Sequence, residues 1–92
     1  MSIQDDVMPG GVPIGSPGNQ RHVRVLPGGR KAAEAFFDRL SKGGTPNTPA
    51  GFPGRGVDVP GGWIGFRPVS GSGEPTIDIR IPGIPIRKLK FV

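Results

Sequence analysis

The C-terminal third of the chain alternates apolar and polar residues with a period of two, the pattern of half-buried β-strands. Three such segments occur, at residues 63–67, 76–81 and 86–91, and short connections rich in Gly, Pro and Ser separate them. Such connections favour antiparallel neighbours. The sequence therefore predicts a sheet with one apolar face, carrying Ile64, Phe66, Ile77, Ile79, Ile81, Leu89 and Phe91, and one polar face, carrying Trp63, Arg67, Thr76, Asp78, Arg80, Lys88 and Lys90.

One segment, at residues 30–44, has the period of an amphipathic helix. Its apolar positions fall at i, i+3, i+4 and i+7 and are Ala33, Phe36, Phe37 and Leu40. Gly43 follows as a residue able to take the left-handed conformation that ends many helices. Weaker strand signals lie at residues 21–29 and 56–60. We therefore predict an α+β fold, with one amphipathic helix packed on a twisted, mostly antiparallel sheet of three to five strands.

The first twenty residues differ from the rest because no period runs through them. Gly and Pro make up half of residues 11–20, and this predicts a flexible arm or linker remnant over residues 1–20. Residues 21–92 then form a single compact domain. A chain of 92 residues has room for one small core only.

Composition narrows the chemistry. There is no Cys and a single His, and the acidic residues are scattered, so the sequence contains no metal-ligand motif and implies no cofactor. No apolar run is long enough for a transmembrane helix. Lys and Arg number 12 against 7 acidic residues, for a net charge of +5. Such an excess indicates a polyanionic or acidic partner.

The polar face of the predicted sheet is the candidate site for a polyanion. Arg67 offers a cation for phosphate oxygens, Thr76 a hydroxyl group, and Asp78 a carboxylate that orients the cations. The alternative is a solvated face in which Arg67–Asp78 and Asp78–Lys88 are cross-strand ion pairs. Trp63 either stacks on a base or is wedged under a loop.

His22 is the one side chain of a type that ordinarily exchanges a proton near neutral pH. It precedes Val23 and Val25, which alternate with it and with Arg24, and we expect it to reach the polar face beside Arg67 if this strand joins the sheet edge. RNA carries its own nucleophile, the ribose 2′-OH, so a proton acceptor and cations suffice to cleave it without metal.

The segment "GFRPVSGSGEPTIDIRIPGIPIRKLKF", which closes the chain after a helix, resembles the C-terminal toxin domains of bacterial polymorphic and contact-dependent inhibition systems, in particular the barnase–EndoU–colicin–RelE-like ribonucleases. The resemblance covers residues 21–92. It implies that Arg67 and Ser70 hold the scissile phosphate, that Thr76 bonds the phosphate or the ribose, and that His22 is the general base or acid. Asp78 or a lysine would fill the second acid–base role.

Further cationic residues would contact flanking RNA in this interpretation; together with Trp63 they are Arg24, Arg80, Arg87, Lys88 and Lys90. The resemblance also implies a larger delivery protein N-terminal to the domain, action in the cytoplasm of a target bacterium, and an acidic immunity protein that covers the basic face.

Three functions remain open from the sequence. The first is a metal-independent toxin ribonuclease that cleaves RNA, with tRNA among its candidate substrates. The second is a non-catalytic nucleic-acid-binding module that uses the same cations. The third is a small structural adaptor of a phage or secretion apparatus, in which the basic charge is incidental.

Overall fold

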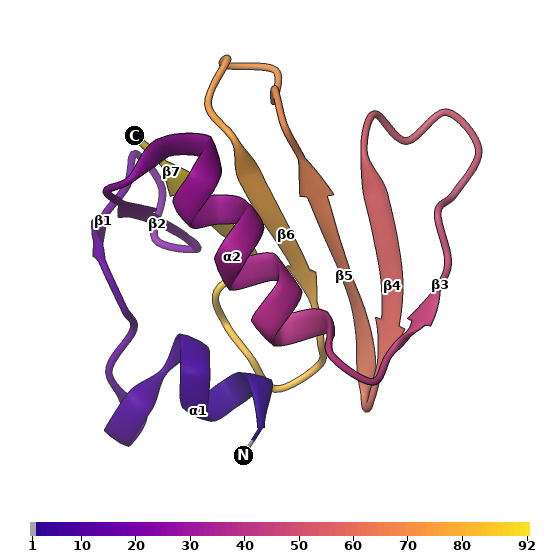
Figure 1. Cartoon of the computed structure of the whole chain (residues 1–92). Helices are drawn as coiled ribbons and strands as arrows, with labels where there is room; N and C mark the ends of the chain where they lie inside the picture. Colours follow the sequence, from indigo (N-terminus) through magenta and orange to yellow (C-terminus); the bar gives the residue numbers. More distant parts are fainter. Residues whose placement is uncertain (1) are drawn as a thin grey trace.

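The computed structural model describes residues 2–92 and shows one long helix laid across a twisted sheet (Figure 1). The elements in chain order are α1 (Ile3–Val7), the 3-10 turn η1 (Pro9–Gly11), β1 (Ser16–Pro17), β2 (Val23–Leu26), α2 (Gly29–Ser41), β3 (Thr45–Pro46), β4 (Arg55–Val59), β5 (Gly62–Arg67), β6 (Thr76–Arg80) and β7 (Lys88–Phe91). The predicted α+β class is confirmed.

The strands form one sheet in the order β1-β2-β7-β6-β5-β4-β3. Neighbouring strands are antiparallel except for β2 and β7, which run parallel, with Val23 opposite Lys88 and Val25 opposite Lys90. After β2, helix α2 carries the chain to β3 at the opposite edge of the sheet, and strands β4 to β7 then return by antiparallel pairing until β7 lies beside β2 in the same direction. The sheet has more strands than the three to five expected, because the edges gain the two-residue strands β1 and β3.

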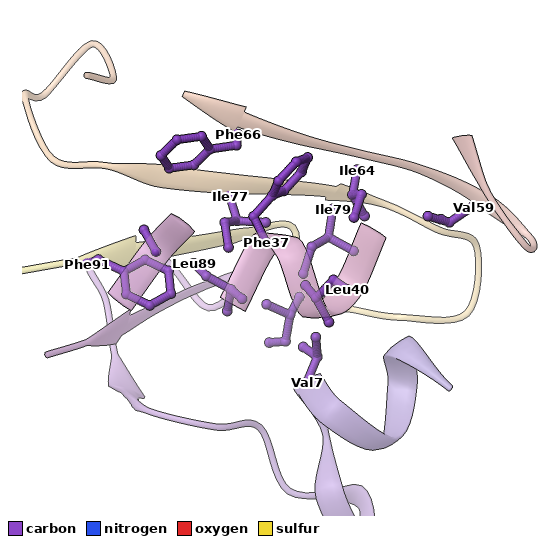
Figure 2. Packing of buried hydrophobic residues seen from close by; sticks show 12 residues of the cluster. Val7, Phe37, Leu40, Val59, Ile64, Phe66, Ile77, Ile79, Leu89 and Phe91 are labelled. Carbon is purple, nitrogen blue, oxygen red and sulfur yellow. The ribbon is translucent and has the colours of Figure 1, made fainter. Parts of the chain in front are cut away.

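The core lies between α2 and the apolar face of the sheet. Phe37 is 1% exposed and packs on Phe66 of β5, with ring centroids 5.8 Å apart. Ile64, Ile77 and Leu89 are fully buried beside them (Figure 2). The predicted apolar stripe and apolar strand face are thus the two halves of a single core.

Two glycines set the ends of α2. Gly28 precedes the helix with φ of 104°, and its N–H and that of Gly29 both donate to the carbonyl of Val92. Gly43 follows the helix with φ of 80°, as its predicted terminating role requires. The left-handed conformation at both positions is accessible to Gly without steric penalty.

The N-terminal segment differs from the flexible arm predicted over residues 1–20, because residues 2–18 pack on the domain. Ser2 and Asp5 form a reciprocal capping box that starts α1. Val7 is fully buried and points toward Leu40 of α2 (Figure 2), and Asp6 forms an ion pair with Arg39 at 2.9 Å. The contacts that Val7 and Asp6 make with α2 are tertiary, so the local sequence pattern of a short helix does not reveal them.

Two loops fold over the polar face of the sheet. Residues 47–54 lie over Trp63, whose indole N–H donates to the carbonyl of Asn47 at 2.8 Å. Residues 68–75, between β5 and β6, reach the cation of Lys90 on β7. The polar face is therefore a partly covered surface with shallow pockets between the loops.

Candidate nucleic-acid interface

Arg67 and Asp78 form the central ion pair of the polar face. Two guanidinium nitrogens of Arg67, Nε and Nη2, donate to the two carboxylate oxygens of Asp78 at 2.8 and 2.9 Å. The side chains are 17% and 9% exposed. This fork geometry fixes the plane of the guanidinium group and leaves its remaining edge directed away from the carboxylate.

The loop between β5 and β6 adds hydroxyl groups beside this pair. Lys90 Nζ donates to Ser72 Oγ at 2.8 Å, and Ser72 Oγ donates to Glu74 Oε1 at 2.7 Å. Ser70 Oγ lies 3.5 Å from Ser72 Oγ. The hydrogen bond from Ser72, opposed by partial desolvation and aided by Lys90, holds the pKa of Glu74 below its usual value.

A shallow pocket opens between these groups. We call it the central pocket; it is lined by Arg67, Ser70, Gly71, Ser72, Lys88 and Lys90. Lys88 forms no ion pair with any residue among 2–92, whereas Lys90 lies 3.7 Å from Glu74. The structure thus brings together three of the predicted cations and the predicted Ser70.

Thr76 lies on this face as predicted but is sealed beneath the loop. Its exposure is 0%, and its hydroxyl donates to the carbonyl of Glu74 at 3.1 Å. Thr76 therefore orients the loop that carries Ser72 and cannot contact a phosphate directly in this conformation.

The indole ring of Trp63 is packed between neighbouring residues and is not exposed for ligand contact. An added Cβ at Gly65 or Gly56 would come within 2.6 Å of its ring, so the indole lies flat on these two residues. Phe52 packs edge-on to it at 5.3 Å, and the guanidinium of Arg80 lies 5.3 Å from the ring centroid. This arrangement leaves no open indole face for stacking on a base.

A second pocket adjoins the central one on this side. This aromatic pocket is lined by Phe52, Pro53, Arg67, Asp78, Arg80 and Lys88. It shares Arg67 and Lys88 with the central pocket, so the two pockets are neighbours. Arg80 therefore keeps its predicted place on the polar face.

Arg24 and Arg87 do not belong to the polar face. The β2–β7 register pairs Arg24 with Leu89, a core residue, so Arg24 projects from the helix side of the sheet. Its guanidinium donates to the carbonyls of Ile14 and Gly15 at 2.9 and 2.8 Å and holds the N-terminal segment. Arg87 lines a separate groove with the β6–β7 connection.

The structure does not bring His22 beside Arg67. His22 lies in the turn before β2, where its carbonyl accepts the N–H groups of Arg87 and Lys88. Strands β7 and β6 separate β2 from β5, which places the backbones roughly 14 Å apart at about 4.8 Å per strand. His22 lines neither of the pockets that Arg67 lines. Its predicted catalytic partnership with Arg67 is therefore unsupported.

Sequence reasoning missed a third pocket on the polar face. This valine pocket is lined by Asn19, Val23, Val25, Ser72, Glu74 and Lys90, among others. It shares Ser72 and Lys90 with the central pocket. Val23 and Val25 reach it because the register with β7 places them on the side of Lys88 and Lys90. The sequence shows that apolar and polar residues alternate along β2, but the pairing with β7 decides which of them lie on the polar face of the sheet.

Among residues 2–92, no three His, Asp or Glu side chains are grouped so that they could hold a metal ion. No helix in the same range has the length and apolar character needed to cross a membrane. No protein-family model, curated protein or solved structure matches the chain. The function is therefore inferred from the residues of the site.

Proposed function

We propose that the polar face of the sheet binds the phosphate backbone of RNA, with one phosphate in the central pocket. The observation that carries this proposal is the convergence of Arg67, Lys88 and Lys90 with the hydroxyl of Ser70 around one shallow opening. Cations and hydroxyl donors are the groups that proteins direct at phosphate oxygens. Lys88 has no ion-pair partner among residues 2–92, so its charge is available to such a ligand.

Single-stranded RNA fits this surface better than a duplex. The three neighbouring pockets are shallow, and one of them has an apolar floor that an unstacked base can cover. The net charge of +5 adds a long-range attraction for the polyanion.

Metal-independent cleavage of RNA at the same pocket is the second candidate function. Asp78 and Lys88 line a pocket together with Arg67, so these two groups are the proposed proton acceptors. In the reaction the 2′-oxygen attacks phosphorus, its proton passes to the acceptor, and the 5′-oxygen leaves and is protonated, giving a 2′,3′-cyclic phosphate. Arg67 and Lys90 would stabilise the charge that builds on the phosphate. Asp78 or Lys88 then takes the role that the sequence assigned to His22.

The resemblance to polymorphic toxin domains gives this second candidate a biological context. In that context the domain is delivered by a larger protein, acts on RNA in the cytoplasm of a target bacterium, and is blocked by an acidic immunity protein over the three pockets. All of these features require that the chain cleaves RNA, whereas the proposed RNA binding requires none of them.

The test is to incubate the purified chain with total RNA in EDTA and, separately, to titrate a labelled single-stranded RNA at several salt concentrations. Salt-dependent binding supports the first proposal, because each phosphate contact releases counterions. Cleavage that is lost in Lys88→Ala or Asp78→Asn but kept in His22→Ala supports the second. Lys31→Ala is the matched control, since Lys31 is exposed on α2, which covers the opposite face. Absence of binding at low salt would show that the proposal is wrong.

A further inference from the structure

The valine pocket has a composition unlike that of the central pocket. Val23 is only 3% exposed and forms its floor with Val25, while the rim carries Asn19 and Glu74. An apolar floor with a few polar rim groups is typical of a site for a flat organic group rather than for a phosphate.

The pocket lies one strand away from the central pocket. Val25 on β2 is paired with Lys90 on β7, so the two side chains are neighbours on the same face at about 4.8 Å between strands. In a nucleotide one ribose separates the phosphate from its base. A phosphate bound at Lys90 in the central pocket therefore places its own or the next base over Val23 and Val25.

A closely packed glycine helps to form the floor. Gly18 donates its N–H to the carbonyl of Val23 at 2.9 Å, and an added Cβ at Gly18 would lie 2.7 Å from Val23 Cγ1. Any larger residue here would displace Val23 and change the shape of the pocket.

Glu74 supplies the polar recognition group. Its Oε1 accepts the hydroxyl of Ser72, whereas its Oε2 accepts no hydrogen bond from residues 2–92. The Ser72 hydrogen bond also keeps the carboxylate ionised by lowering its pKa. An ionised carboxylate accepts hydrogen bonds and donates none.

We infer that the valine pocket binds the base adjacent to the held phosphate and that Glu74 selects guanine; this inference rests on the proposed RNA binding. The Watson–Crick edge of guanine presents two adjacent donors, N1–H and N2–H, to one carboxylate. Uracil presents carbonyl oxygens on both sides of its single N–H, and adenine and cytosine place an acceptor nitrogen beside their amino group, so each brings an oxygen or nitrogen lone pair against Glu74. The amide of Asn19 can donate to guanine O6 from the same rim.

The test uses labelled hexauridylate and three otherwise identical hexamers with one central G, A or C, titrated by fluorescence anisotropy. We expect the G hexamer to bind roughly tenfold more tightly than hexauridylate, since a bidentate contact contributes about 1–3 kcal/mol of discrimination. Glu74→Gln should bring the G-to-U affinity ratio close to one, even though removal of a negative charge raises the affinity for every hexamer. Glu34→Gln, the same substitution on exposed α2, should leave the ratio unchanged.

The outcomes separate this inference from the function on which it rests. Salt-dependent binding with equal affinity for all four hexamers overturns the base subsite and leaves RNA binding intact. Absence of binding to any hexamer overturns both. A ratio that survives both Glu74→Gln and Glu74→Ala assigns the discrimination elsewhere and contradicts the role of Glu74.

Discussion

The two faces of the central sheet are made by the same strands but are held in different ways. On one face Phe66, Ile77 and Leu89 alternate inward and meet a single long helix. On the other face Arg67, Asp78 and Lys90 alternate outward; Arg67 pairs with Asp78, and Lys90 donates a hydrogen bond to Ser72 of the loop between β5 and β6. The apolar face is stabilised by the area it buries, and this hydrophobic contribution does not depend on the direction of individual contacts. The polar face depends instead on the placement of individual hydrogen-bond donors and acceptors. Stability is therefore concentrated on one side of the sheet, and the proposed ligand binding uses the other.

The largest expected effect is on the apolar face. Phe37→Ala should lower the free energy of unfolding by about 3–5 kcal/mol, because it removes the ring that packs on Phe66 and leaves a cavity under α2. Urea denaturation followed by circular dichroism measures the change. Phe52→Ala, a matched substitution on the polar face, should cost about 1 kcal/mol, since Phe52 is only partly buried and loses mainly its edge contact with Trp63. Equal losses in the two variants would contradict the division between the faces.

The next effect concerns the Arg67–Asp78 ion pair, the best shielded of those among residues 2–92. Arg67→Ala should destabilise the fold by about 2 kcal/mol, because the side chain of Asp78 is only 9% exposed and would keep its charge without a partner. Urea denaturation again gives the value. Arg30→Ala breaks an exposed pair with Glu34 and should cost less than about 0.5 kcal/mol. If the double variant Arg67→Leu/Asp78→Leu were as unstable as Arg67→Ala, the cost would not arise from an unpaired carboxylate.

A smaller effect on stability, but a clear one on binding, is expected at Lys88. Lys88→Ala should change the free energy of unfolding by no more than about 0.5 kcal/mol, because no ion pair within residues 2–92 is lost. The slope of log affinity for RNA against log salt should fall by about 1. Affinity titrations at four salt concentrations give the slope, with Lys31→Ala as the control. An unchanged slope would remove Lys88 from the phosphate contacts.

The smallest effect is at the rim of the valine pocket. Ser72→Ala should raise the pKa of Glu74 toward its usual value of 4.5, because the hydrogen bond from Ser72 is the largest cause of its lowering. A carboxyl group whose pKa is lowered by folding stabilises the fold above its unfolded pKa and loses this contribution as pH falls through the folded value. The variant should therefore lose less stability than the parent protein as the pH falls below 4.5. Carboxyl chemical shifts followed by NMR measure the pKa, and Ser41→Ala, at the end of α2, should leave it unchanged.

Much of the fold could be predicted from local pattern. The helix at residues 30–44 and the strands containing Ile64, Ile77 and Leu89 appear where their periods indicated, because a half-buried element must repeat its apolar residues at its own pitch. The packing of the N-terminal segment could not be predicted in this way. Five residues of α1 are too few to show a period, and Val7 gains its importance from Leu40, far along the chain.

The candidate site was predictable in part for the same reason. Arg67, Ser70, Lys88 and Lys90 come together because they lie on one face of neighbouring strands or in the loop between two of them. His22 is the counterexample: the alternation after it predicts a strand, but it does not predict which strand this one pairs with, in what direction or with what register.

The amino-acid sequence by itself determined which residues alternate, where the helix ends and that one face of the sheet would be basic, since these follow from short-range spacing and charge. Only the tertiary structure decided that β2 lies parallel to β7, that Val23 and Val25 therefore line a pocket beside Lys90, and that His22 stays outside it. A shift of one residue in register exchanges the two faces of a strand. That choice is made by long-range contacts, and no local pattern records it.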